Sequence, residues 1–117
     1  MEKRIKKIFD NLRREGVVGL AAVDKEGEVI ASDLPPTAHV ETFGIMTATV
    51  IGASSSANSE LDRGSVKITT IDSGKGKIIL ANTIGDLIIC VVTDRSLDHQ
   101  EMYSDIHSAV DKINEFF

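Results

Sequence analysis

A long stretch without charged residues constrains this sequence more than any other feature. No residue between Glu41 and Glu60 is charged, and residues 38–61 are rich in Gly, Ala, Ser and Thr, with apolar residues at helical spacing. The spacing predicts one helix over this stretch. A surface helix normally carries charged residues on its outer face, so this helix is expected to be covered on two sides. It is too rich in small polar residues, and too poor in leucine, to span a bilayer.

Helical spacing separates the side chains of this stretch into a bulky side and a small side. The bulky side is expected to pack on a sheet, whereas small residues at four-residue steps leave a groove in which another backbone can approach closely. We predict that the small side, together with an edge strand at residues 66–72, forms the interface of a dimer. The bulky side carries Val40, Phe43, Met46, Thr47, Val50, Ser54, Ala57 and Leu61. The predicted interface consists of Gly44, Ala48, Gly52 and Ser56 on the helix and Val66, Ile68 and Thr70 on the strand.

Size and composition indicate one globular domain over residues 1–117. Hydrophobic residues make up 42% of the chain and charged residues 26%, as is typical of soluble domains. A formal net charge of -5 and a low content of aromatic residues argue against nucleic-acid binding. The single cysteine, Cys90, lies in an apolar run and is expected to be a buried structural thiol. With no apolar signal segment at the N-terminus, the sequence predicts a cytoplasmic protein.

The remaining segments predict an α+β fold with the element order αββαβββα. Residues 2–15 read as a helix ended by Gly16, and Thr37 is the expected cap of the central helix. Short connections make neighbouring strands antiparallel, and the strand at 86–93 is apolar at nearly every position, so it is expected at the centre of the sheet. The strands are predicted at residues 17–23, 28–32, 65–72, 77–83 and 86–93, with a final helix after Ser96 or Asp98. This string is satisfied by a five-stranded antiparallel sheet with the central helix on one face and the two terminal helices on the other.

The two terminal helices carry opposite charge. The first has a basic outer face, whereas the region of the last carries an acidic row. The row consists of Asp94, Asp98, Glu101 and Asp105. It is either a surface for a partner protein or a solvated face of the kind favoured near a helix N-terminus.

Motifs that carry catalytic or metal chemistry do not emerge from the sequence, and no catalytic residue, cofactor site or metal site is predicted. Residues 74–77, Gly-Lys-Gly-Lys, lack the spacing of a phosphate-binding loop and are expected to form a hairpin turn. His39, His99 and His107 show no metal spacing, and the serines at 54–56 have no nucleophile-elbow context. Arg63 and Arg95 lie in predicted loops, where they either solvate the loop or reach a partner's nucleotide as arginine fingers.

Several short motifs, in this order and spacing, resemble the Roadblock family. They are Gly16-Val17-Val18-Gly19, Val23-Asp24-Lys25-Glu26-Gly27, Val29-Ile30-Ala31-Ser32, the helix rich in Ser, Ala and Gly, and Ser59-Glu60-Leu61-Asp62-Arg63-Gly64. The family includes dynein light chains and prokaryotic regulators of Ras-like GTPases. The resemblance covers nearly the whole chain and implies a homodimer or heterodimer in which sheets join edge to edge and central helices pair. It also implies a non-enzymatic adaptor that binds a small Ras-like GTPase or tethers a complex. The alternative is a ligand-sensing or purely scaffolding α/β module.

Overall fold

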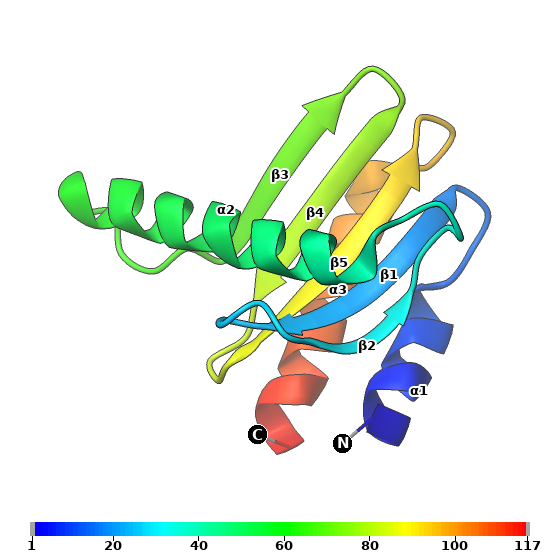
Figure 1. Cartoon of the computed structure of the whole chain (residues 1–117), viewed down its shortest axis with the longest axis horizontal. Helices are drawn as coiled ribbons and strands as arrows, with labels where there is room; N and C mark the ends of the chain where they lie inside the picture. Colours follow the sequence, from blue (N-terminus) through cyan, green and yellow to red (C-terminus); the bar gives the residue numbers. More distant parts are fainter. Residues whose placement is uncertain (1, 117) are drawn as a thin grey trace.

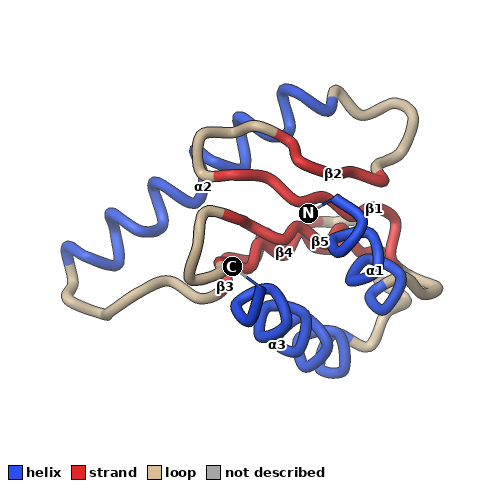
Figure 2. Tube along the Cα trace, turned by 90° about the horizontal axis from the view of Figure 1, so that it is seen from below, coloured by secondary structure: helices blue, strands red, loops and turns tan. Residues whose placement is uncertain are grey.

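The computed structural model describes residues 2–116 and has one five-stranded antiparallel sheet with helices on both faces. The strand order is β2-β1-β5-β4-β3. Helix α2 crosses one face, while α1 and α3 lie side by side on the other (Figures 1 and 2). The elements are α1 (Glu2–Leu12), β1 (Val17–Asp24), β2 (Val29–Asp33), α2 (Val40–Glu60), β3 (Ile68–Ser73), β4 (Gly76–Asn82), β5 (Leu87–Asp94) and α3 (His99–Phe116). The predicted fold class, element order and distribution of the helices are all confirmed.

The larger part of the core lies between the sheet and the pair α1 and α3. Ile5, Leu12, Met102 and Ile106 are fully or almost fully buried there against the sheet. Within each helix these residues are seven or four positions apart, which is about two turns or one, so each helix presents one apolar stripe to the strands. The apolar stripes of α1 and α3 therefore form this part of the core.

Strand β5 is the centre of the sheet, as its continuous apolar sequence predicts. It pairs with β1 on one side and β4 on the other. Cys90, on the α2 side of this strand, is fully buried. Burial raises the pKa of the Cys90 thiol to about 12, an effect that a hydrogen bond with Thr47 only partly opposes. The prediction of a buried structural thiol is confirmed.

The end of α1 and the start of α2 differ from the predicted boundaries by more than one residue. Helix α1 ends at Leu12, three residues early, because Arg13 to Gly16 turn the chain into β1, with Gly16 at a φ of 95°. Thr37 does not cap α2: the backbone N–H of Ala38 bonds to the Pro35 carbonyl oxygen at 2.9 Å, so Thr37 lies in a turn and the helix begins later. The observed N-cap, His39, makes no side-chain capping bond.

Strand β3 starts at Ile68, later than its sequence pattern suggests. The preceding segment is held by the end of β4 instead. The Asn82 side-chain Nδ2 donates to the Val66 carbonyl oxygen, and the Asn82 backbone N–H donates to that of Lys67, both at 2.9 Å. Val66 is therefore a loop residue fastened to β4 and does not belong to the strand.

The buried side of α2 also differs from the predicted bulky side. Val40, Phe43, Thr47, Val50 and Ser54 face the sheet at least in part, as predicted. Ala57, Met46 and Leu61 are exposed, the last two at 52% and 73%, while Ile51 and Gly44 are buried instead. Ala57 and Leu61 are exposed because α2 crosses the sheet obliquely and its C-terminal part runs out beyond β3, where it has no sheet to pack on (Figure 1).

Candidate functional site

The N-terminal half of α2 is fastened to the first hairpin by a contact between two glycines. A Cβ atom built on Gly44 would lie 2.4 Å from the Gly27 carbonyl oxygen and 2.7 Å from Cγ2 of Val29. Gly27 itself has a φ of 96°, a conformation that glycine adopts at little cost. The small residue at 44 thus permits a close backbone approach, but the approaching backbone belongs to the same chain. The prediction that Gly44 faces a partner is wrong for this reason.

The rest of the predicted small face of α2 is exposed and carries no charge. Ala48 is half-buried, whereas Gly52 and Ser56 are exposed, and no atom lies within 4 Å of a Cβ built on Gly52. We call Ala48, Gly52 and Ser56 the outer face of α2. An uncharged helix face of this length is unusual on a surface that stays in water.

Strand β3 forms one free edge of the sheet, and its outward backbone groups can be assigned. Lys67 O bonds to β4, and hydrogen bonding alternates along an antiparallel pair. The N–H and C=O groups of Thr69 and Ile71 therefore face β4, while those of the even-numbered residues point away from the sheet. These outward residues are Ile68, Thr70 and Asp72. The register with β4 is regular throughout, so no bulge interrupts the edge, which is open to pairing.

One side-chain contact that the sequence does not reveal ties this edge to α3. The hydroxyl groups of Thr70 and Tyr103 lie 2.7 Å apart, within hydrogen-bond distance. Lys77 lies over the Tyr103 ring, 6.0 Å from its centre. Thr70 and Tyr103 are 33 positions apart, and no sequence pattern predicts a contact between them. The bond holds the Thr70 side chain on the face of the sheet that α3 covers.

The acidic row is engaged within the chain. Asp94 Oδ1 accepts hydrogen bonds from the Ser96 backbone and hydroxyl at 2.9 and 2.6 Å, and these bonds lower the pKa of the Asp94 carboxyl. Asp98 accepts from the Gln100 N–H at 3.0 Å and so caps α3. Glu101 and Asp105 both face the Arg14 guanidinium, at 3.7 and 2.6 Å.

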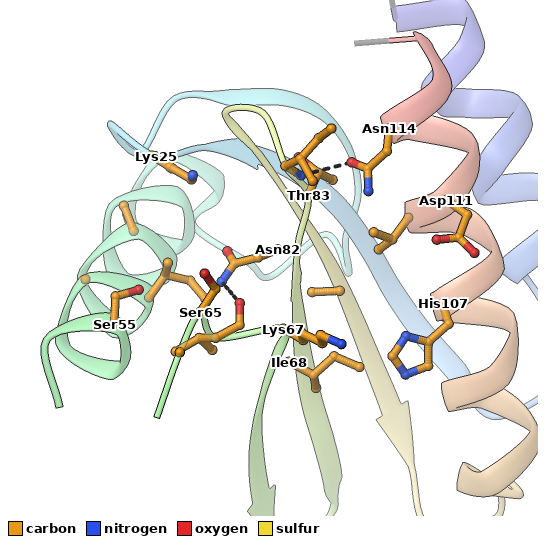
Figure 3. Close-up of a pocket in the computed structure, with 18 of the residues that line it drawn as sticks. Lys25, Ser55, Ser65, Lys67, Ile68, Asn82, Thr83, His107, Asp111 and Asn114 are labelled. Atoms are coloured by element: carbon orange, nitrogen blue, oxygen red, sulfur yellow. Dashed lines mark hydrogen bonds between the residues drawn. The ribbon is translucent and has the colours of Figure 1, made fainter. Parts of the chain in front are cut away.

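One hollow of about 780 Å³ curves around the end of β4. Figure 3 shows Ser55, Ser65 and Lys25 on the α2 side of the strands, and His107 and Asp111 on the α3 side. The lining groups therefore do not converge on one point as they do in most ligand sites. Asn82 Oδ1 is buried here without a hydrogen-bond partner among the described residues.

The residues considered for catalysis or ligand binding are accounted for locally. Gly74 and Lys75 form the predicted hairpin turn between β3 and β4, while Gly76 and Lys77 are the first residues of β4. Arg95 bonds to that turn through the Gly74 carbonyl oxygen at 2.9 Å and to Asp72 at 3.3 Å. His99 Nε2 lies 3.0 Å from Thr93 Oγ1, and Arg63 is exposed in the loop after α2. Across residues 2–116, no group of three or more potential metal ligands comes together, and no helix is both long and apolar enough to cross a membrane.

Comparisons with known proteins agree with this fold. Two uncharacterized proteins of Methanocaldococcus jannaschii are each 31% identical to the chain, over 90% and 100% of it and 91% and 99% of their own lengths. Structures of MglB from Myxococcus xanthus and Thermus thermophilus superpose with TM-scores of 0.82 and 0.84, at 14% and 13% identity. They cover 99% and 97% of this chain, which in turn covers 89% and 87% of theirs.

A Roadblock/LC7 domain from Streptomyces avermitilis has a TM-score of 0.83 at 10% identity, over 99% of this chain and 96% of that domain. At these identities the solved structures establish the fold alone. The family model described as the Roadblock/LC7 domain matches residues 5–93, from within α1 to near the end of β5. The chain therefore belongs to the Roadblock/LC7 family.

Proposed function

We propose that this chain is a non-enzymatic, dimeric adaptor of the cytoplasm that binds a small Ras-like GTPase and modulates its nucleotide cycle or its location. The observation that carries the proposal is the pair of surfaces described above, the outer face of α2 and the free edge of β3. Both lie at the same side of the molecule, because α2 overhangs β3 (Figure 1). Family membership supports the adaptor role, since the family includes regulators of Ras-like GTPases.

The β3 edge suggests a specific arrangement of two copies. A two-fold axis perpendicular to the sheet at Thr70 would pair Thr70 with its own copy and Ile68 with Asp72 of the second copy. All of these residues point their N–H and C=O groups outward, so the two sheets would join in one continuous ladder. The axis keeps both α2 helices on the same face. The part of each α2 that extends beyond β3 would then lie over the sheet of the other copy. There it would cover the other copy's Ile71, which is 39% exposed in the single chain.

Light scattering at micromolar concentration tests the dimer. Wild-type protein is expected to have twice the mass of one chain. Thr70→Pro should give a monomer, because proline removes an outward N–H at the axis while edge strands tolerate it. Thr70→Val is the matched control: it keeps the N–H and the shape, loses only the bond to Tyr103, and should remain a dimer. Gly52→Leu tests separately whether the α2 helices of the two copies pack against each other, as the family resemblance implies. A close helix crossing at Gly52 has no room for a leucine side chain. A monomeric wild type would refute the arrangement.

Binding of the GTPase is tested with Ras-like GTPases of the same organism, each loaded with GDP or with a non-hydrolysable GTP analogue. A regulator must prefer one nucleotide state, because equal affinity for both shifts no equilibrium. Surface plasmon resonance should therefore give different affinities for the two forms. Equal affinities would leave a passive scaffold, and no binding of either form would refute the GTPase partner. The adaptor itself should bind neither GTP nor ATP in calorimetry.

The surface that meets the GTPase remains a prediction centred on the acidic row. The double variant Asp98→Lys, Glu101→Lys should slow association and reduce its dependence on salt, because rim charges act mainly on the association rate. The dimer should stay intact in this variant. An unchanged association rate would place the contact with the GTPase elsewhere on the surface. Glu101 also pairs with Arg14, so the variant breaks an ion pair within the chain as well as reversing surface charge.

A further inference from the structure

The sheet has a second free edge at β2, and its outward backbone groups can also be assigned. The Asp24 N–H donates to the Glu28 carbonyl oxygen at 2.9 Å, so even-numbered residues of β1 bond toward β2. Val29 and Ser32 lie opposite the odd-numbered Val23 and Ala21, which bond toward β5. The N–H and C=O groups of Val29 and Ser32 therefore point away from the sheet.

This edge differs from the β3 edge because it lies at the floor of a groove. The groove holds about 720 Å³ and is walled by α1 on one side and α2 on the other. Its walls are formed by Glu2 and Lys6 of α1 and by Val40, Glu41 and Ile45 of α2. A second sheet that carries its own helices cannot reach the β2 edge between the walls formed by α1 and α2. A single extended segment is narrow enough to lie between them. An irregularity in the pairing at Ile30 confines the regular run to Ala31–Asp33, so only a short segment can pair.

The groove has a definite chemistry. Ile45 is 54% exposed beside the edge, and Val29 and Val40 are half-buried, which offers apolar contacts. Three carboxylates, of Glu2, Glu28 and Glu41, face one ammonium group, that of Lys6, and Lys6 lies 3.6 Å from Glu2. Glu28 and Glu41 make no ion pair with any described residue. The excess of negative charge therefore favours a basic occupant.

We propose that this groove binds a short, extended segment of a partner protein with alternating basic and apolar side chains, which adds a strand to β2. Main-chain hydrogen bonds to Val29 and Ser32 would fix the segment, and the glutamates would select lysine or arginine. A second copy of this chain is a poor occupant, because its own β2 edge carries the same excess of negative charge. The groove lies at the opposite edge from β3, so the proposal is independent of the dimer.

A fluorescein-labelled octapeptide of alternating lysine and valine is the probe, and fluorescence anisotropy at low salt is the measurement. Wild-type protein should bind it, and a glutamate-valine octapeptide should not bind. Ser32→Pro removes an outward donor from an edge strand that tolerates proline, and should weaken binding about tenfold. Ser32→Thr keeps the N–H and is the matched control, with affinity unchanged within about twofold. Circular dichroism checks that each variant is folded.

A pair of charge variants separates the groove from the overall acidity of the protein. Glu28→Lys, Glu41→Lys should weaken binding and flatten its salt dependence. Asp111→Lys, Glu115→Lys makes the same change in net charge at two exposed positions of α3 and should leave the affinity unchanged. No binding by wild type up to about 1 mM would overturn the proposal. So would equal weakening by the two charge variants, or binding that survives both Ser32→Pro and the charge reversal in the groove.

Discussion

The two glycines of α2 lead to opposite predictions for the same substitution, Gly to Ala. Alanine has the higher helix propensity by about 1 kcal/mol, and this gain applies at both positions. At Gly52 no atom lies within 4 Å of the new Cβ, so Gly52→Ala should stabilise the folded chain by about that amount. At Gly44 the new Cβ would lie 2.4 Å from the Gly27 carbonyl oxygen, a backbone atom that cannot rotate aside.

The contact at Gly44 forces α2 to move off the sheet or the hairpin to bend. Overpacking of this kind costs about 1–3 kcal/mol, and a clash with backbone places Gly44 at the upper end of that range. After subtraction of the gain in helix propensity, Gly44→Ala should lower the free energy of unfolding by about 2 kcal/mol. For a chain of this length 1 kcal/mol corresponds to roughly 4 °C in Tm. We therefore expect Gly44→Ala to melt roughly 8 °C below wild type and Gly52→Ala roughly 4 °C above it.

Thermal melts followed by circular dichroism at one protein concentration provide the assay. Light scattering on each variant at that concentration separates a change in association from a change in the stability of the chain. The comparison between the two variants is more informative than either alone, because helix propensity is common to both. If Gly44→Ala melts at or above the wild-type temperature, the close approach of α2 to the first hairpin does not exist as described.

Three further predictions follow from single sites. Gly76→Ala should destabilise the protein more than Gly44→Ala does, because its Cβ would lie 1.9 Å from the Thr93 carbonyl oxygen at a φ of 148°, as checked by urea unfolding. Ser96→Ala removes a hydrogen bond to the Asp94 carboxylate and should raise the Asp94 pKa toward its usual value, as measured by NMR titration. Because folding lowers this pKa, the stability that the ionised Asp94 contributes is present above the pKa of the unfolded chain and is lost as pH falls through the pKa of the folded chain. Cys90 should react with a thiol reagent only upon unfolding, so its labelling rate should follow the population of unfolded chain; fast labelling in native buffer would contradict its burial.

Much of the fold can be predicted from the sequence because local patterns determine it. The apolar run before Asp94 places β5 at the centre of the sheet, and short connections make its neighbours antiparallel. The stripes of α1 and α3 are legible because charged residues mark their outer faces. In α2 that marker is missing between Glu41 and Glu60, so the side facing the sheet cannot be told from the side facing water. Met46 and Leu61 were assigned to the wrong side for this reason.

The candidate site is predictable only where it depends on the local chain. The edge position of β3, for example, follows from the alternation of its side chains. The contact of Gly44 with Gly27 joins residues that no motif connects, and it depends on where the helix crosses the hairpin. The pairing of Arg14 with Asp105 likewise depends on how α1 and α3 are juxtaposed. Opposite charge on the two helices indicated an attraction, but not which residues it would engage.

The pairing of β1 with β5 also affects how the chain folds. Val17–Asp24 find their central partner in Leu87–Asp94, so the middle of the sheet joins segments from the two ends of the sequence. Closing so long a loop has an entropic cost before any contact compensates it, and topologies of this kind fold slowly. During synthesis β1 and β2 emerge first, as a hairpin whose inner edge stays bare until β5 leaves the ribosome. The nascent chain therefore exposes a third, hydrophobic strand edge that the finished protein never presents.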